Sequence, residues 1–370
     1  MNTNNFSATP KAIHTHAIHP GAGKDFRSVA ASSAYLKPRK KRILLQCTHC
    51  QMTLKNPRKC SKCKSVWYCS QKCQKKNWPT HKLTCHETDR SSGSLKFIRM
   101  FISNPLIMGY LKIGIIFDCG LLDKPGIGFD VPFVARVDIG IEPSDILDFI
   151  GLYLDDKAIG EKLQGMVQVN AVTPRYPSLM RPLTPQQLHL WREARAMYNA
   201  KGFAKDPVGL VDFVDGSCPG YWKNGVTVGL HIPTIVLDMA RKREPFVHVS
   251  AVTGTRFKQP MNAVACLEYI NAHIREDTQN QLRLRTEMTD KDKEIIRAAG
   301  RNEGTFSARI LKEKMEREHL YANIPGPHRR EGLGIKISLS RRYSTYCWLP
   351  FVFVVLFLSL LPMLPLLVHV

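Results

Sequence analysis

The spacing of hydrophobic positions predicts that residues 95–321 form a domain of mixed strands and helices. Every second side chain from Ala135 to Ile141 is apolar, which is the period of a strand with one buried face. Similar apolar runs predict further strands in residues 166–172, 208–214, 225–232 and 245–257. Apolar positions recur every three to four residues in five segments that we expect to be helices, namely 143–154, 184–202, 261–274, 289–300 and 306–321. The fold class expected here is α+β.

Local signals indicate where some of these helices begin and end. Ser144 is a suitable N-cap for the first of them, and Thr184 is a suitable N-cap for the second, which Gly202 should end. The apolar residues 95–118 should form a helix on each side of Pro105. Their charges and interruptions make them a poor candidate for a membrane span.

Residues 348–370 differ from the rest because these 23 positions hold no Asp, Glu, Lys or Arg. About 20 apolar residues suffice to cross the hydrocarbon of a bilayer, and prolines are tolerated there. Arg341 and Arg342 precede the stretch, so the positive-inside rule keeps the remainder in the cytosol. Since residues 1–30 lack an apolar signal segment, we predict a C-terminal hydrophobic helix that anchors the chain to a membrane, after a linker over 322–346. The alternative is an apolar tail outside any membrane.

Charge is concentrated at the N-terminal end. Residues 1–86 carry 17 Lys and Arg but one acidic side chain, so they account for most of the formal net charge of +22. Residues 1–46 have no sustained hydrophobic period, and we expect a disordered basic arm. Its run Lys37–Arg42 is typical of a nuclear import signal or a polyanion contact. A solvated arm with no such contact is the alternative.

Seven of the 11 cysteines lie between Cys47 and Cys85. In a chain without a secretion signal, such a cluster favours metal ligation over disulfides. The candidate ligands follow the spacing C-x2-C-x9-C-x2-C-x5-C-x3-C-x7-H-x3-C and are Cys47, Cys50, Cys60, Cys63, Cys69, Cys73, His81 and Cys85. Each C-x2-C pair fits a tight turn, and each pair spaced by four fits one turn of helix. Eight ligands make two tetrahedral zinc sites, and the four pairs can be joined in several ways.

The order of these ligands, with YCSQKCQ, then Trp78, then HKLTC, resembles the MYND-type zinc finger. The resemblance covers residues 47–85 of the expected finger at 47–86. It implies an interleaved pairing, in which Cys47, Cys50, Cys69 and Cys73 hold one Zn²⁺ while Cys60, Cys63, His81 and Cys85 hold the other. His49 and His86 fall outside this pattern. A RING finger would instead end in C-x2-C.

The resemblance also implies a ligand, because MYND fingers typically bind proline-rich peptides. The positions that match the family's peptide contacts are Gln74 and Trp78, which are four residues apart and should share one face of a helix. An indole can stack on a proline ring while an amide bonds the free backbone of an extended segment. The alternative is that Trp78 only caps the small core of the finger.

Catalytic motifs are missing, and we name no catalytic residue. SET-type lysine methyltransferases can contain MYND fingers, but this sequence lacks NHxCxPN-like and GEExxxxY-like runs. Cys218 and His231 are a possible nucleophile pair, yet nothing supplies a third member. The chain is therefore more readily understood as a non-enzyme, with an unknown activity in 95–321 as an alternative.

The function that we expect is that of a zinc-binding adaptor, which captures a proline-containing segment of another protein and is tethered to a membrane facing the cytosol. A second hypothesis is a nuclear regulator that contacts DNA or chromatin through the basic arm and finger. It is secondary because no helix with base-reading side chains and no aromatic platform is evident.

Overall fold

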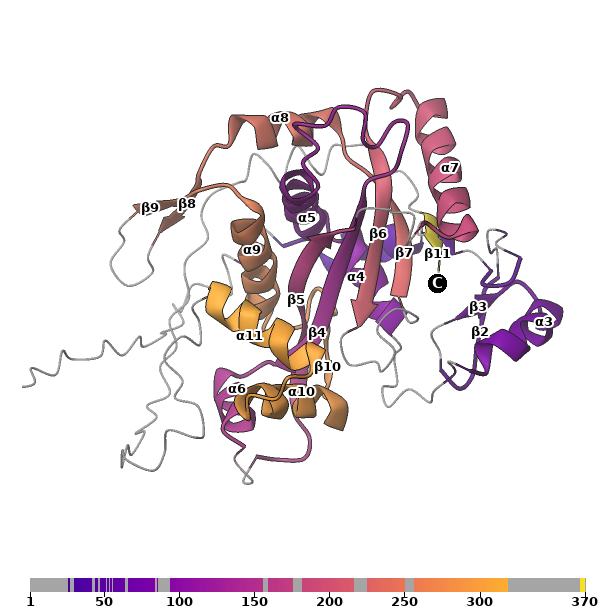
Figure 1. Ribbon diagram of the computed structural model, residues 1–370. Coiled ribbons are helices and arrows are strands. Elements are labelled where there is room, and N and C mark those ends of the chain that lie inside the picture. The colour runs from indigo at the N-terminus through magenta and orange to yellow at the C-terminus, as the bar shows by residue number, and fades with distance from the viewer. Residues whose placement is uncertain are drawn as a thin grey trace, which may run out of the picture.

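A mixed sheet forms the centre of the computed structural model (Figure 1). Among the described residues it has seven strands in the order β1-β11-β7-β6-β4-β5-β10. The strand bounds are Leu44–Leu45 for β1, Val134–Pro143 for β4, Gln164–Pro174 for β5, Val208–Asp215 for β6, Gly225–His231 for β7, Arg285–Glu287 for β10 and Leu367–His369 for β11. The structure describes Phe26, residues 30–41, 44–85 except 46, 51, 53, 55, 64, 65 and 84, and residues 94–155, 159–175, 182–215, 225–249, 256–318 and 367–369.

Eight of the ten described helices follow the sequence pattern. Their bounds are Ser33–Lys41 for α2, Gln71–His81 for α3, Ser94–Ser103 for α4, Pro105–Asp118 for α5, Ile146–Tyr153 for α6, Pro185–Ala200 for α7, Thr234–Lys242 for α8, Ala263–Glu276 for α9, Asp290–Gly300 for α10 and Phe306–Glu318 for α11. The exceptions are α8, which no sequence signal predicted, and α2, which lies in the arm that was expected to be disordered. The α+β class is confirmed.

Alternation along the strands sends side chains to two different packing layers. Val134 and Leu210 pack against α7, whereas Ala135 and Val211 belong to the larger core that contains α5 and α9. This is the period-2 pattern of strands whose two faces are both covered. β4 lies inside the sheet, because it pairs antiparallel with β5 on one side and parallel with β6 on the other. Nearly every residue in β4 is buried.

The cap of α7 is confirmed, and that of α6 is corrected. Thr184 Oγ1 accepts a hydrogen bond from Gln187 N at 3.1 Å, and Gln187 Oε1 accepts one from Thr184 N at 3.1 Å, so the two form a capping box. Ser144 does not cap α6. Its neighbour Asp145 does, through an Oδ1 that accepts from Leu147 N at 2.8 Å. Both residue types suit an N-cap, so the sequence alone could not choose between them.

Pro105 divides the apolar segment 95–118 as expected. α4 ends before Asn104, whose Oδ1 accepts from the backbone N–H of Leu106 at 3.0 Å and so begins α5. Among the described helices, none is by itself long and apolar enough to cross a membrane. By length and composition α4 and α5 would pass that test only as a pair, and they meet at an angle of 91°.

One expectation about the ends of the chain needs correction, and a second falls mostly outside the described residues. Residues 1–46 were expected to be disordered, but Ser33–Lys41 form α2, Leu36 is buried, and the ring of Phe26 lies 5.0 Å from that of His273 in α9. The hydrophobic helix over 348–370 lies outside the described residues, apart from Leu367–His369. Those three residues form strand β11 rather than a helix.

The segment 245–257, which was predicted as one strand, contributes to two strands in the structure. It supplies β8, Phe246–Val249, and runs into β9, Arg256–Gln259, which pairs antiparallel with β8 outside the main sheet.

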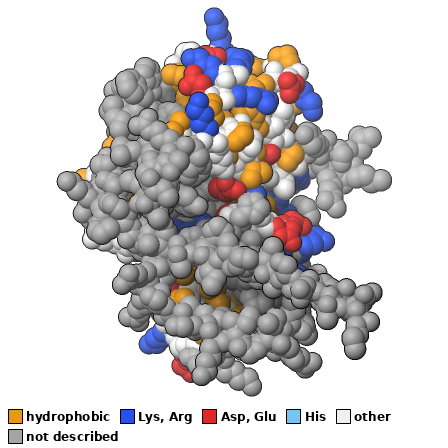
Figure 2. All heavy atoms as spheres, turned by 90° about the vertical axis from the view of Figure 1, so that its left-hand side faces the viewer, with side chains coloured by type: hydrophobic (Ala, Val, Ile, Leu, Met, Phe, Trp, Pro, Cys, Tyr) orange, Lys and Arg blue, Asp and Glu red, His pale blue; other side chains and the backbone are white. Residues whose placement is uncertain are grey.

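Near α8, at the top of Figure 1, acidic and basic side chains are interspersed on the surface (Figure 2). Arg241 and Asp238 of α8 are an example, with an ion pair of 2.7 Å.

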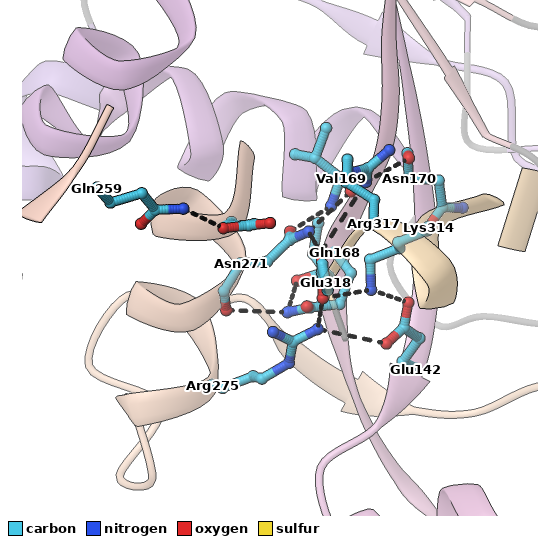
Figure 3. Close-up of polar contacts among 12 residues, drawn as sticks. Glu142, Gln168, Val169, Asn170, Gln259, Asn271, Arg275, Lys314, Arg317 and Glu318 are labelled. Atoms are coloured by element: carbon cyan, nitrogen blue, oxygen red, sulfur yellow. Dashed lines mark hydrogen bonds and ion pairs between the residues drawn. The ribbon is translucent and has the colours of Figure 1, made fainter. Parts of the chain in front are cut away.

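A buried group of charges joins α11 to the sheet and to α9 (Figure 3). The ammonium of Lys314 bonds Glu142 of β4 and lies 3.6 Å from Glu318, while Arg275 of α9 bonds Glu318 at 2.5 Å. Burial raises the pKa of Glu318, but Arg275 and Lys314 outweigh it, and the pKa falls to about 2. Asn271 completes the group by bonding both Glu318 and the backbone of Val169.

Candidate metal centre

Two backbone turns place the first four cysteines. Cys47 N donates to Met52 O at 2.9 Å, and Cys60 N donates to Val66 O at 3.0 Å, so each C-x2-C pair lies on a closed turn. The short antiparallel strands β2, Arg58–Lys59, and β3, Trp67–Tyr68, flank the second turn. The first turn is joined to them by Thr48 N, which donates to Trp67 O at 2.9 Å. This arrangement presents both sulfurs of each pair on the same side of its turn, as the spacing predicted.

Helix α3 supplies one ligand from each of its ends. Ser70 caps it, with Oγ accepting from Cys73 N at 3.2 Å, so Cys73 lies in the first turn and His81 is the last helical residue. Cys69 precedes the helix and Cys85 follows it. The expectation that each pair shares one helical turn is therefore wrong for Cys69 and Cys85, although all four residues are near enough to ligate.

The eight predicted ligands form two groups, and in each group the ligand atoms lie within 4.8 Å of one another. One group is Cys47, Cys50, Cys69 and Cys73, and the other is Cys60, Cys63, His81 and Cys85. This is the interleaved pairing that the resemblance implied. His49 is exposed and belongs to neither group, while His86 lies outside the described residues.

The distances within the groups fit zinc. A tetrahedral ion with Zn–S bonds of about 2.3 Å holds two sulfurs roughly 3.8 Å apart, and a sulfur and an imidazole nitrogen roughly 3.6 Å apart. The Sγ atoms of Cys50 and Cys69 are 3.6 Å apart, those of Cys60 and Cys85 are 3.8 Å apart, and Cys63 Sγ is 3.6 Å from His81 Nε2. A disulfide would need about 2.05 Å. The finger therefore contains a Cys₄ and a Cys₃His group for two Zn²⁺ ions.

Two thiols and the histidine are electrostatically prepared for a cation, whereas burial and neighbouring thiols raise the pKa of Cys50, Cys73 and Cys85. Burial raises the pKa of the Cys47 thiol, but the backbone N–H groups of Cys50, Cys69 and His49 lower it more, and it falls to about 7. The pKa of Cys60 is lowered by the same kind of balance. Burial lowers the pKa of His81, which keeps the imidazole neutral, as metal ligation requires.

Tyr68 is buried beside the Cys₃His group. Its side chain is fully buried, its hydroxyl accepts from Asn77 Nδ2 at 3.0 Å, and its ring lies 6.4 Å from that of His81. The ring of the ligand His81 therefore packs edge-on against a tyrosine whose hydroxyl is held by Asn77. Tyr68 thus supplies apolar packing for one of the two metal groups.

Gln74 and Trp78 both lie on α3, as predicted. Trp78 is 44% exposed, and its ring meets the ring of His81 edge-on at 5.8 Å. The exposed part of the indole is open to a ligand, while its contact with His81 is also what a residue that caps the small core of the finger would make. Gln74, one turn earlier, is half-buried.

The remaining sequence candidates give no catalytic arrangement. Cys218 lies outside the described residues. His231 is buried, bonds Asp206 through Nε2 at 2.6 Å and stacks on Tyr198 at 4.4 Å, so its contacts are those of a structural histidine. A cavity between β4, α10 and α11, beside Glu142, has a volume of about 20 Å³, which is room for a water molecule.

Sequence reasoning missed the buried charges around Lys314. The run KEKMERE reads as a solvated helix, and no local signal marks which lysine is buried. Only the pairing of α11 with Glu142 and Arg275, which are distant in sequence, makes that burial possible.

Comparison with known families assigns both parts of the chain. A model described as MYND finger matches residues 47–85. A model described as domain of unknown function (DUF8205) matches residues 91–321, which is more than half of the chain. The chain belongs to the DUF8205 family. The DUF8205 domain contains the central strands β4 to β7 and the helices α4 to α11.

Similarity to curated proteins is confined to short stretches. The chain is 42% identical over 65 residues to N-lysine methyltransferase SMYD2-B of Danio rerio, and 52% identical over 42 residues to Zinc finger MYND domain-containing protein 10 homolog of Drosophila melanogaster. It is 44% identical over 39 residues to N-lysine methyltransferase SMYD2 of Homo sapiens. The matches cover 16%, 11% and 10% of this chain and 15%, 9% and 9% of the relatives. No solved structure matches.

Proposed function

We propose that this chain is an adaptor whose zinc-loaded finger binds a proline-containing segment of another protein through α3. The observation that carries the proposal is the exposed indole of Trp78 beside the amide of Gln74 on one helix. A flat indole suits the ring of proline. An amide can bond a polyproline II backbone, whose own N–H and C=O groups are free.

The helix that bears these residues is held rigidly, which favours recognition. Cys73 near its start belongs to the Cys₄ group, and His81 at its end belongs to the Cys₃His group. Both ends of α3 are therefore fixed by different ions. A surface that is already ordered loses little conformational entropy when it binds an extended segment.

The methyltransferase names of two relatives add nothing to this proposal. The matched stretches are at most 65 residues long and cover no more than 15% of each relative. The two methyltransferase sequence runs sought above are also missing. We assign the DUF8205 domain the role of a scaffold. The reason is that β1, which ends two residues before Cys47, joins the central sheet through β11.

The test is a calorimetric titration of the zinc-loaded full chain with a peptide that contains Pro-x-Leu-x-Pro. Trp78→Ala should weaken binding about tenfold or more, as loss of a central aromatic contact does, and Gln74→Ala should weaken it less. Both variants should retain two zinc ions. Thr80→Ala is the control, since Thr80 is exposed on the opposite side of α3. Equal affinity of Trp78→Ala and the parent chain would refute the proposed peptide face.

A further inference from the structure

The finger carries a one-sided charge that its fold does not use. Residues 47–85 contain no Asp or Glu, and the described basic side chains of the finger are all exposed; these are Arg58, Lys59, Lys62, Lys72, Lys75, Lys76 and Lys82. In the part of the chain that the structure describes, none of these seven forms a salt bridge. The surface near α8, where both signs are interspersed, is different (Figure 2).

The zinc groups neutralise only a part of this charge. Seven thiolates and two Zn²⁺ ions sum to about −3, while the finger has nine Lys and Arg in total. An excess of about six positive charges remains at its surface. Unpaired charge of one sign on a binding surface attracts and orients partners of the opposite sign.

Two of the lysines are placed around the indole. Lys75 lies three residues before Trp78, and Lys82 lies four residues after it, in the helical conformation that ends α3. Positions three and four apart on a helix are neighbours, with Cβ atoms about 5–6 Å apart. Lys75, Trp78 and Lys82 therefore follow one another along one face. Cys73, Asn77 and His81 lie four residues apart on the face turned toward the zinc groups and Tyr68.

We infer that the segment bound by this finger carries Asp or Glu on both sides of its proline. The inference rests on the proposed function, because it takes the indole of Trp78 as the seat of the proline. An extended chain that runs along α3 places its flanking residues about one helical turn from the indole in either direction. Those are the positions of the two ammonium groups, where carboxylates gain attraction and basic side chains are repelled.

An acidic peptide fits this surface better than a nucleic acid. A strand of nucleic acid is held by several aromatic platforms along a basic groove. Here two lysines bracket a single indole, and six of the seven described basic side chains are lysines, which lack the fork of arginine for bidentate contacts with phosphate. One indole between two ammonium groups favours a peptide in which a single proline has acidic neighbours.

The experiment compares three peptides that share one proline–leucine core and differ only in their flanks, which are Glu, Gln or Lys. Each is titrated into the zinc-loaded full chain at low and at physiological salt. We expect the Glu-flanked peptide to bind about five- to tenfold tighter than the Gln-flanked one at low salt, with a smaller ratio at higher salt. The Lys-flanked peptide should bind most weakly.

A charge exchange locates the effect. The double variant Lys75→Glu, Lys82→Glu should prefer the Lys-flanked peptide. The double variant Lys59→Glu, Lys62→Glu has the same net charge and should keep the parent's preference for Glu flanks. Zinc content is measured for every variant, so that loss of the finger is recognised.

The outcomes separate this inference from the function on which it rests. Equal binding of the three peptides would overturn the acidic flanks and leave the adaptor role in place. Failure of all three peptides to bind an intact finger would overturn both. A preference reversed equally by the control variant would show a general charge effect and overturn the placement around Trp78. Displacement of the acidic peptide by single-stranded nucleic acid at lower concentration would identify a nucleic-acid surface instead.

Discussion

Cys63 Sγ lies 3.6 Å from His81 Nε2, although 18 positions separate the two residues in the sequence. The intervening chain carries Cys69 and Cys73, which belong to the other metal group. Neither group can therefore form without ordering the segment that holds the other. The finger should gain and lose its two zinc ions together.

Replacement of one ligand tests this coupling. Cys63→Ser removes a thiolate from the Cys₃His group, and we expect the whole of residues 47–85 to lose its order because zinc binding supplies the folding free energy of so small a unit. Zinc per chain should fall from two toward zero, and the chemical-shift dispersion of the finger should collapse. Cys266→Ser is the control, since Cys266 is buried in α9, far along the chain from the metal groups. A variant that retains one firmly bound zinc would contradict the coupling.

The buried charges should dominate the stability of the DUF8205 domain. Lys314→Met removes the ammonium between Glu142 and Glu318, whose side chains are 3% and 2% exposed, and leaves two carboxylates without it. We expect the free energy of unfolding to fall by about 3–5 kcal/mol.

Urea denaturation of the two chains measures this loss. Lys312→Met, on the same helix but partly exposed, should change the stability by less than about 1 kcal/mol. A similar effect of both substitutions would mean that the buried pairs contribute no more than a surface lysine.

Acid should destabilise the domain through His273. The ring is buried beside Phe26, and burial lowers its pKa from 6.5 to about 4. Since the folded pKa lies below the unfolded one, the unfolded chain takes up the proton first as the pH falls. The contribution of His273 to the free energy of unfolding is fully present above pH 6.5. It is lost progressively as the pH falls to about 4, and the total loss is up to about 3 kcal/mol.

The matched measurement compares the parent chain with His273→Leu by urea denaturation across this range. The finger titrates equally in both, so its contribution cancels in the difference. The stability of the variant relative to the parent should rise as the pH falls from 7 to 4. A constant difference would show that burial does not lower the pKa of His273 in the folded chain below its unfolded value.

Membrane tethering by residues 348–370 stays a prediction. A helix over the whole segment and the pairing of Val368 with Val228 in β7 exclude each other. Cells expressing the full chain and a chain truncated after Tyr346 would be fractionated, and the membranes washed with alkaline carbonate. If the segment is an anchor, the full chain should resist extraction and the truncated chain should be released. Release of both would favour the strand.

Local chemistry made the finger predictable, and distance in sequence concealed the rest. The zinc ligands and the capping box of Thr184 follow from residue types at short fixed spacing. The burial of Lys314 depends on Glu142, 172 positions away, and the packing of Phe26 depends on α9, so no window of the sequence contains either signal. Where two local choices were equally good, as for Ser144 and Asp145, the pattern could fix the helix but not its first residue.

The attachment of the finger has a mechanical consequence. β1 is an end strand of the central sheet and stops two residues before Cys47, while α4 begins nine residues after Cys85. The finger is thus inserted between an end strand of the sheet and the first helix of the DUF8205 domain, with a short connection on each side. A force applied to a segment bound as proposed would be transmitted to β1 and to the start of α4. A segment bound as proposed would therefore be held within a few residues' reach of the central sheet.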